Sequence, residues 1–164
     1  MRGEVPDRAR WVLVMIDLSG RMDGSTRLQK LAFLASQMVP DLAKFEFYSD
    51  WRPSKYGPFS PTLSEDVEGL ESRELVKKVQ VQFSETSTLD QYFLTTAGKT
   101  LAVQTEEGSP DLVNSLRKSI ISKYSKAPLM ELLHVIYYQY PEYTIESRVA
   151  GDVFGFSKSR ESAR

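Results

Sequence analysis

A single stretch of this chain has the pattern of a β-hairpin, and the segments on both sides of it have the pattern of helices. Val79, Val81 and Phe83 alternate with polar residues, which is the period of a half-buried strand. A polar turn over residues 84–90 leads to a second apolar run at residues 92–94. The expected class is therefore a mainly α fold with one small β-hairpin.

Helical periodicity and capping residues predict six helices around this hairpin. Ser60 followed by Pro61 is the clearest helix start, because serine is a good N-cap and proline at the first helical position loses no hydrogen bond. We expect Asp7, Ser25 and Thr95 to cap three of the others. The expected helices cover residues 7–19, 25–39, 60–76, 95–104, 110–124 and 128–140. Residues 45–51 are expected to be extended, and residues 52–59 to form a loop, because two prolines and a glycine oppose a helix there.

Three helices, a hairpin and a further helix are the element order of a winged helix-turn-helix domain. We assign residues 1–106 to this winged-helix-like domain and residues 107–150 to a C-terminal helical extension. Residues 151–164 are polar and contain glycine, which predicts a flexible tail.

Composition excludes several classes of protein. The chain has no cysteine, which rules out disulfide scaffolds, thiolate zinc sites and cysteine nucleophiles and favours a reducing cytoplasm. The first ten residues carry three arginines and no apolar stretch, so no signal peptide is expected. The apolar run at residues 11–16 is far shorter than the roughly 20 residues of a membrane span. We expect a soluble cytoplasmic protein with no membrane partner.

No catalytic, metal or cofactor site is predicted. His134 is the only histidine and lies in an apolar helical stretch, which is typical of a core or boundary residue. The chain has no Gly-x-Ser-x-Gly elbow, no Gly-x-Gly-x-x-Gly sequence and no phosphate-binding loop. We therefore expect a protein that is not an enzyme and needs no cofactor.

The third helix and the loop before it together predict a face that binds a protein partner. Residues 60–74 carry five carboxylates against one arginine, which would repel DNA phosphates. Residues 51–60 contain three aromatics and two cations but no acid, a composition typical of interface hot spots. The loop can equally serve only to aim the third helix. The candidate partner-binding residues are Trp51, Arg52, Lys55, Tyr56, Phe59, Glu68 and Glu71.

DNA binding is the alternative, and it would need a local basic surface because the formal net charge is only −1. The basic residues are also compatible with an ordinary solvated surface. The candidate DNA contacts are Arg27, Lys30, Arg52, Lys55, Lys77 and Lys78.

The C-terminal helices carry closely spaced tyrosines, which favours a homodimer. Tyr137 and Tyr138 are the candidate dimer contacts, because the apolar stripe at residues 129–140 exceeds what one small domain needs to cover. The alternative is that these helices only complete the core.

Two short motifs resemble the SocA-like (Panacea) domain family and the related YwgA-type proteins. They are Leu28-Gln29-Lys30-Leu31 on a helix and Tyr56-Gly57-Pro58 opening the next one. The similarity covers roughly residues 25–80, with Gln29, Lys30, Gly57 and Pro58 as motif positions. It implies a winged-helix-like domain that acts as an antitoxin or as an adaptor presenting a toxin to a protease. Many SocA-like members have a tryptophan or histidine where this chain has Lys55-Tyr56, which favours the YwgA-type branch.

Overall fold

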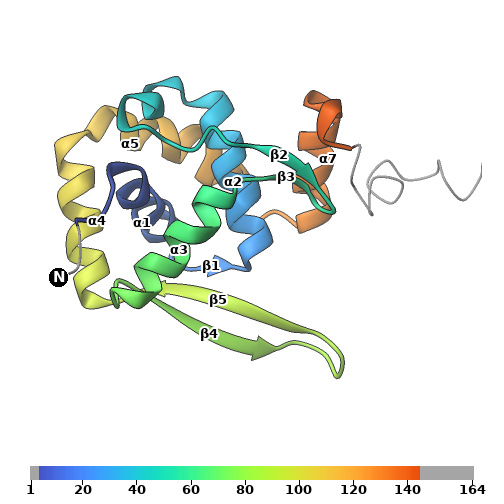
Figure 1. Ribbon diagram of the computed structural model, residues 1–164, viewed down its shortest axis with the longest axis horizontal. Helices are drawn as coiled ribbons and strands as arrows, with labels where there is room; N and C mark the ends of the chain where they lie inside the picture. Colours follow the sequence, from blue (N-terminus) through green and yellow to red (C-terminus); the bar gives the residue numbers. More distant parts are fainter. Residues whose placement is uncertain (1–3, 145–164) are drawn as a thin grey trace, which may run out of the picture.

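The computed structural model describes residues 4–144 and shows a mostly helical protein with a small antiparallel sheet (Figure 1). The helices are α1 (Asp7–Ser19), α2 (Ser25–Met38), α3 (Pro61–Ser72), α4 (Thr96–Gly108), α5 (Pro110–Leu116), α6 (Ser122–Tyr124) and α7 (Leu129–Gln139). The strands are β1 (Met22–Asp23), β2 (Arg52–Ser54), β3 (Gly57–Phe59), β4 (Val76–Gln82) and β5 (Thr88–Leu94). Short 3₁₀ turns η1 (Pro40–Phe45) and η3 (Pro141–Thr144) and a π turn, η2 (Arg117–Ile121), complete the elements.

The expected hairpin is present as β4 and β5, and it extends along one side of the helices (Figure 1). Val76 faces Leu94 at its base and Gln82 faces Thr88 near its tip. A third strand, β1, pairs with β5 and gives the order β1-β5-β4. Two residues are too few to show an alternating pattern, so the sequence did not reveal β1.

The segment expected to be a loop forms a second small hairpin, β2–β3. Arg52 faces Phe59, Pro53 faces Pro58 and Ser54 faces Gly57. Neither proline has an N–H, so the two can face one another only where an antiparallel pair exchanges no hydrogen bonds. The prolines therefore fix the register instead of preventing the strands. The expected extended segment at residues 45–51 contains the end of η1 and no strand.

The predicted helix caps are half right. The hydroxyl of Ser60 accepts the N–H of Leu63 at 3.1 Å, and that of Thr95 accepts the N–H of Gly98 at 3.0 Å. Asp7 and Ser25 do not cap their helices, because the N-cap positions are Pro6 and Gly24. Helix α4 is longer than expected, so the domain boundary placed at residue 106 falls inside it.

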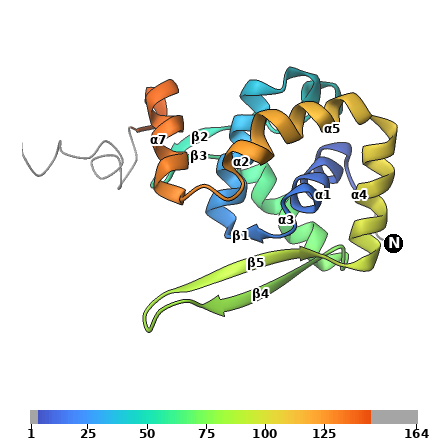
Figure 2. The same ribbon diagram turned by 180° about the vertical axis from the view of Figure 1, so that it is seen from behind.

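One hydrophobic core joins the N-terminal helices to the helices that follow residue 107. Residues 11–16 of α1 and residues 31–35 of α2 are buried throughout. The same cluster includes Leu116, Ile120 and Ile136. Figure 2 shows α7 beside α2, and η2 contacts both α1 and α2. The C-terminal helices therefore complete the core of the helical domain, and the expected tail at residues 151–164 lies outside the described residues.

Gly98 sets how closely α4 approaches the joint between α3 and β4. A Cβ at Gly98 would lie 2.0 Å from the carbonyl oxygen of Leu75, a backbone atom that also accepts the N–H of Thr95. We expect Gly98→Ala to lower the free energy of unfolding by about 1–3 kcal/mol. The matched control is Gly108→Ala, because a Cβ there meets nothing within 4 Å. Urea denaturation measures both, and equal stabilities would contradict the close approach.

Candidate functional site

The two short motifs singled out in the sequence meet in the fold. Lys30 donates from Nζ to the carbonyl oxygen of Pro58 at 2.6 Å. Gln29 donates from Nε2 to the carbonyl oxygen of Ser60 at 3.0 Å and accepts the N–H of Ser60 at 2.8 Å. The side chains of Gln29, Lys30 and Ser60 are all buried. Helix α2 therefore holds both the second strand of the β2–β3 hairpin and the start of α3.

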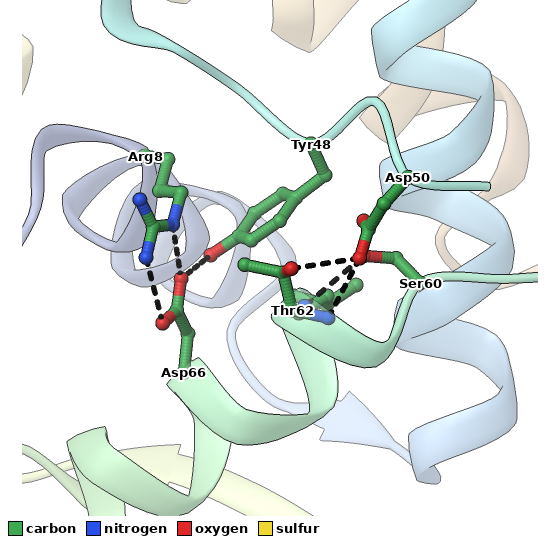
Figure 3. Close-up of polar contacts among 7 residues, drawn as sticks. Arg8, Tyr48, Asp50, Ser60, Thr62 and Asp66 are labelled. Carbon is green, nitrogen blue, oxygen red and sulfur yellow. Dashed lines mark hydrogen bonds and ion pairs between the residues drawn. The ribbon is translucent and has the colours of Figure 1, made fainter.

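Asp50 secures the same helix start from the other side (Figure 3). Its carboxylate accepts the N–H of Thr62 at 3.1 Å, the hydroxyl of Thr62 at 2.7 Å and the hydroxyl of Ser60. Burial acts to raise the pKa of Asp50, but the hydrogen bonds from Ser60 and Thr62 outweigh it and lower the pKa. A carboxylate at this helix N-terminus is also favoured by the helix dipole.

Asp66 of α3 turns into the protein, toward Arg8 and Tyr48 (Figure 3). Its Oδ2 atom accepts Arg8 Nε at 2.7 Å and the hydroxyl of Tyr48 at 2.7 Å. The hydrogen bond to Asp66 raises the pKa of Arg8, and burial raises the pKa of Tyr48. This carboxylate therefore ties α3 to α1 and to the segment after η1, and it adds nothing to an external acidic face.

A groove of about 330 Å³ lies between α3, the first turns of α2, the β2–β3 hairpin and the β-sheet. Its volume is at the lower end of the range of ligand-binding pockets. Its lining combines apolar side chains, hydroxyls, two glutamates and two lysines. The residues are Ser25, Thr26, Leu28, Gln29, Lys30, Ser54, Tyr56, Phe59, Leu63, Ser64, Val67, Glu68, Glu71, Lys78 and Tyr92.

The charges of the groove are not balanced, although two carboxylates and two amines line it. Glu68 is exposed and has no ion pair or hydrogen bond within residues 4–144. Glu71 lies 3.7 Å from Lys78, and both side chains are partly exposed, so this pair is weak. Burial lowers the pKa of Lys30 to about 7, so this amine is only partly charged at neutral pH. The accessible charge on the wall formed by α3 is negative.

The groove brings together four of the seven residues predicted to bind a partner: Tyr56, Phe59, Glu68 and Glu71. Tyr56 is 45% exposed at the rim. Arg52 and Lys55 lie on the same hairpin and are exposed, but they do not line the groove.

Trp51, the residue before β2, packs against α2. Its ring packs edge-on against Phe33 with centroids 5.3 Å apart, and its Nε1 donates to the carbonyl oxygen of Tyr48 at 3.0 Å. This placement fits the alternative that part of the loop serves to aim α3.

The six basic residues predicted as DNA contacts differ in how they are engaged. Lys30 needs correction, because its amine is buried on the carbonyl oxygen of Pro58 and cannot reach a phosphate. Arg27 donates from NH1 to the carbonyl oxygens of Ala127 at 2.6 Å and Ser125 at 3.3 Å, which ties α2 to the C-terminal helices. The exposed remainder is Arg52 and Lys55 on one hairpin and Lys77 and Lys78 on the other.

The two tyrosines predicted to make dimer contacts have different environments. Tyr137 is fully buried, and its ring lies against Gly57, so its predicted place in a dimer interface needs correction. Gly57 has a φ of +88°, and a Cβ there would lie 3.0 Å from the Tyr137 ring, so glycine is required on both counts. Helix α7 thereby supports the turn of the β2–β3 hairpin. Tyr138 is 75% exposed and stacks on His134, which lies on the outer face of α7 and not in the core.

A carboxyl pair between α1 and α4 escaped the sequence analysis. Burial, together with a hydrogen bond to Asp17, raises the pKa of Glu106 to about 7. Burial acts to raise the pKa of Asp17 too, but hydrogen bonds with Glu106 and Lys99 outweigh it and lower the pKa. The pKa values of the two carboxyls are therefore shifted in opposite directions. Asp17 and Glu106 are far apart in sequence, so no local pattern indicates that they meet.

Within residues 4–144 there is no cluster of three or more histidine, cysteine or acidic side chains able to hold a metal ion. None of the described helices is both long and apolar enough to cross a membrane. No protein-family model matches the chain, and no curated protein is significantly similar to it.

The buried amine of Lys30 makes stability depend on pH. Between pH 7 and 10.5 the unfolded chain holds the lysine proton and the folded chain releases it, so the free energy of unfolding rises with pH. The slope from this group is at most about 1.4 kcal/mol per pH unit. We expect Lys30→Met to lose this rise, measured by urea denaturation from pH 7.5 to pH 9.5.

The matched control for the pH series is Lys118→Met, which removes an exposed lysine. Its slope should equal that of the unsubstituted protein. A Lys30→Met protein that keeps the full slope would show that Lys30 is charged in the folded state.

Proposed function

We propose that this protein is a non-enzymatic regulatory module of the winged-helix type that binds a protein partner. The observation that carries the proposal is the groove, which collects Tyr56 and Phe59 from one hairpin and Glu68 and Glu71 from α3. Aromatic side chains beside charged ones, over an apolar floor, are the composition of a protein-binding hot spot. The resemblance to SocA-like (Panacea) proteins adds an antitoxin-like or adaptor-like role.

The order of elements supports the winged-helix assignment. Three helices, α1, α2 and α3, precede the β4–β5 hairpin, and β1 between the first two helices completes the sheet. The hairpin follows α3 directly and projects beside it, as a wing would (Figure 1).

The charge of α3 favours a protein partner over DNA. In a winged helix α3 would be the helix that enters the major groove. Its exposed carboxylates would face phosphates there and oppose the electrostatic attraction on which DNA affinity depends. Two of the basic residues predicted as DNA contacts add no free charge beside α3, because the amine of Lys30 is internal and Arg27 is bonded to backbone carbonyls.

Reversing the charge of the groove should abolish binding of the partner. We expect Glu68→Lys with Glu71→Lys to reduce the protein recovered with the tagged chain at least about tenfold, measured by quantitative mass spectrometry. The control is Glu65→Lys with Glu107→Lys, which makes the same change in net charge at exposed positions outside the groove. Undiminished recovery with a folded groove variant would contradict the proposal.

We also propose a homodimer through the outer face of α7. Tyr138 is 75% exposed and Met130 is 41% exposed, two turns apart on the same helix face. Light scattering should give a mass above 18.7 kDa that falls on dilution, and Tyr138→Ser should shift the equilibrium toward the single chain. A mass of one chain at all concentrations would refute the dimer.

A further inference from the structure

We infer that the groove takes a basic segment of the partner: an extended or turn peptide that places a lysine or arginine beside an aliphatic or aromatic side chain. This inference rests on the proposed function and specifies the chemistry of the partner. Two features of the groove carry it, namely the sign of its accessible charge and the apolar floor next to that charge.

The sign of the charge follows from how each ionisable side chain in the groove is engaged. The amine of Lys30 is buried and donates to Pro58, and burial favours its neutral form. Lys78 is placed against Glu71, so its charge is already partly compensated. Glu68 has no such partner within the described part of the chain. An incoming cation therefore gains a free carboxylate at Glu68, whereas an incoming anion meets it as a repulsion.

Glu71 can contribute to the same cation. Its carboxylate lies 3.7 Å from Lys78 Nζ, which is longer than a good charge-assisted hydrogen bond. Both side chains are more than 30% exposed, so the pair is screened by water and easily rearranged. Glu68 and Glu71 are three residues apart on α3, so they lie on neighbouring positions of one helix face. A guanidinium or ammonium group bound here would balance the cluster, with two carboxylates facing Lys78 and the incoming cation.

The floor beside the carboxylates is apolar. Leu28, Leu63 and Tyr92 line the groove and are at most 5% exposed, so they form a fixed base rather than a mobile surface. Val67 lies on α3 one residue before Glu68 and lines the same groove. An apolar side chain of the partner can pack here while its basic neighbour reaches α3. The volume of about 330 Å³ suits a few side chains and not a folded element.

Three pools of fluorescent nonapeptides test the inference directly. All pools share randomised aliphatic and aromatic positions and have blocked ends. They differ only in two fixed positions, which are lysine or arginine in one pool, aspartate or glutamate in the second, and serine in the third. Fluorescence anisotropy with the full chain should show binding of the basic pool alone, weakening as salt is raised.

Matched variants test whether the basic peptides bind in the groove. Glu68→Gln with Glu71→Gln should raise the dissociation constant of the basic pool about tenfold. Glu65→Gln with Glu107→Gln removes two exposed carboxylates outside the groove and should change it less than about twofold. Tyr56→Ser, at the exposed rim, should weaken binding without altering its salt dependence.

Four outcomes of these experiments would overturn the inference. Preference for the acidic pool, equal binding of all pools, no binding of any pool, or equal losses in the two double variants would each be inconsistent with a basic occupant. The proposed function is tested separately, by measuring how much partner is recovered with the Glu68→Lys, Glu71→Lys variant. If the recovered partner depends on Glu68 and Glu71 while no basic peptide binds, the groove is an interface but its occupant has different chemistry.

Discussion

The hydrogen bonds from α2 to β3 and to the start of α3 are the constraint on which the rest of this structure depends. A buried lysine with one carbonyl partner is costly to desolvate, so its position is strongly determined by the bond that it makes to Pro58. Gln29 adds a reciprocal pair with the backbone of Ser60. These bonds fix the hairpin and α3 relative to α2, and those three elements form most of the walls of the groove.

The acidic residues around α3 divide into two kinds because the helix is fixed in this way. Asp50 and Asp66 work inward, one capping the helix start and the other pairing with Arg8 and Tyr48. Glu68 and Glu71 lie farther along the helix and line the groove. The inward pair sets the rotation of α3, and that rotation leaves the outward pair on the groove wall. The position of Glu68 and Glu71 in the groove therefore depends on Asp50 and Asp66, whose carboxylates hold α3 in place.

The sequence predicted the features that depend on neighbouring residues and missed those that depend on distant ones. Local sequence patterns predict the β4–β5 hairpin and the caps at Ser60 and Thr95, and all three are present. The burial of Lys30 and Tyr137 is not local: each packs against the β2–β3 hairpin, which itself was expected to be a loop. Surface roles for these two residues had to be corrected for that reason, whereas Tyr56, Phe59, Glu68 and Glu71 do line one groove.

Two ionisable groups, the half-buried Glu106 and the buried Lys30, act on stability in opposite directions and in adjoining pH ranges. Glu106 keeps its proton in the folded chain up to about pH 7, against an ordinary value of 4.5, so its contribution falls as the pH rises through that interval. Lys30 loses its proton in the folded chain from about pH 7, against an ordinary value of 10.5, so its contribution rises with pH above that point. From these two groups alone, stability is lowest near pH 7. The amine of Lys30 nevertheless holds β3 to α2 through its bond to the carbonyl oxygen of Pro58, a contact that an apolar side chain cannot make.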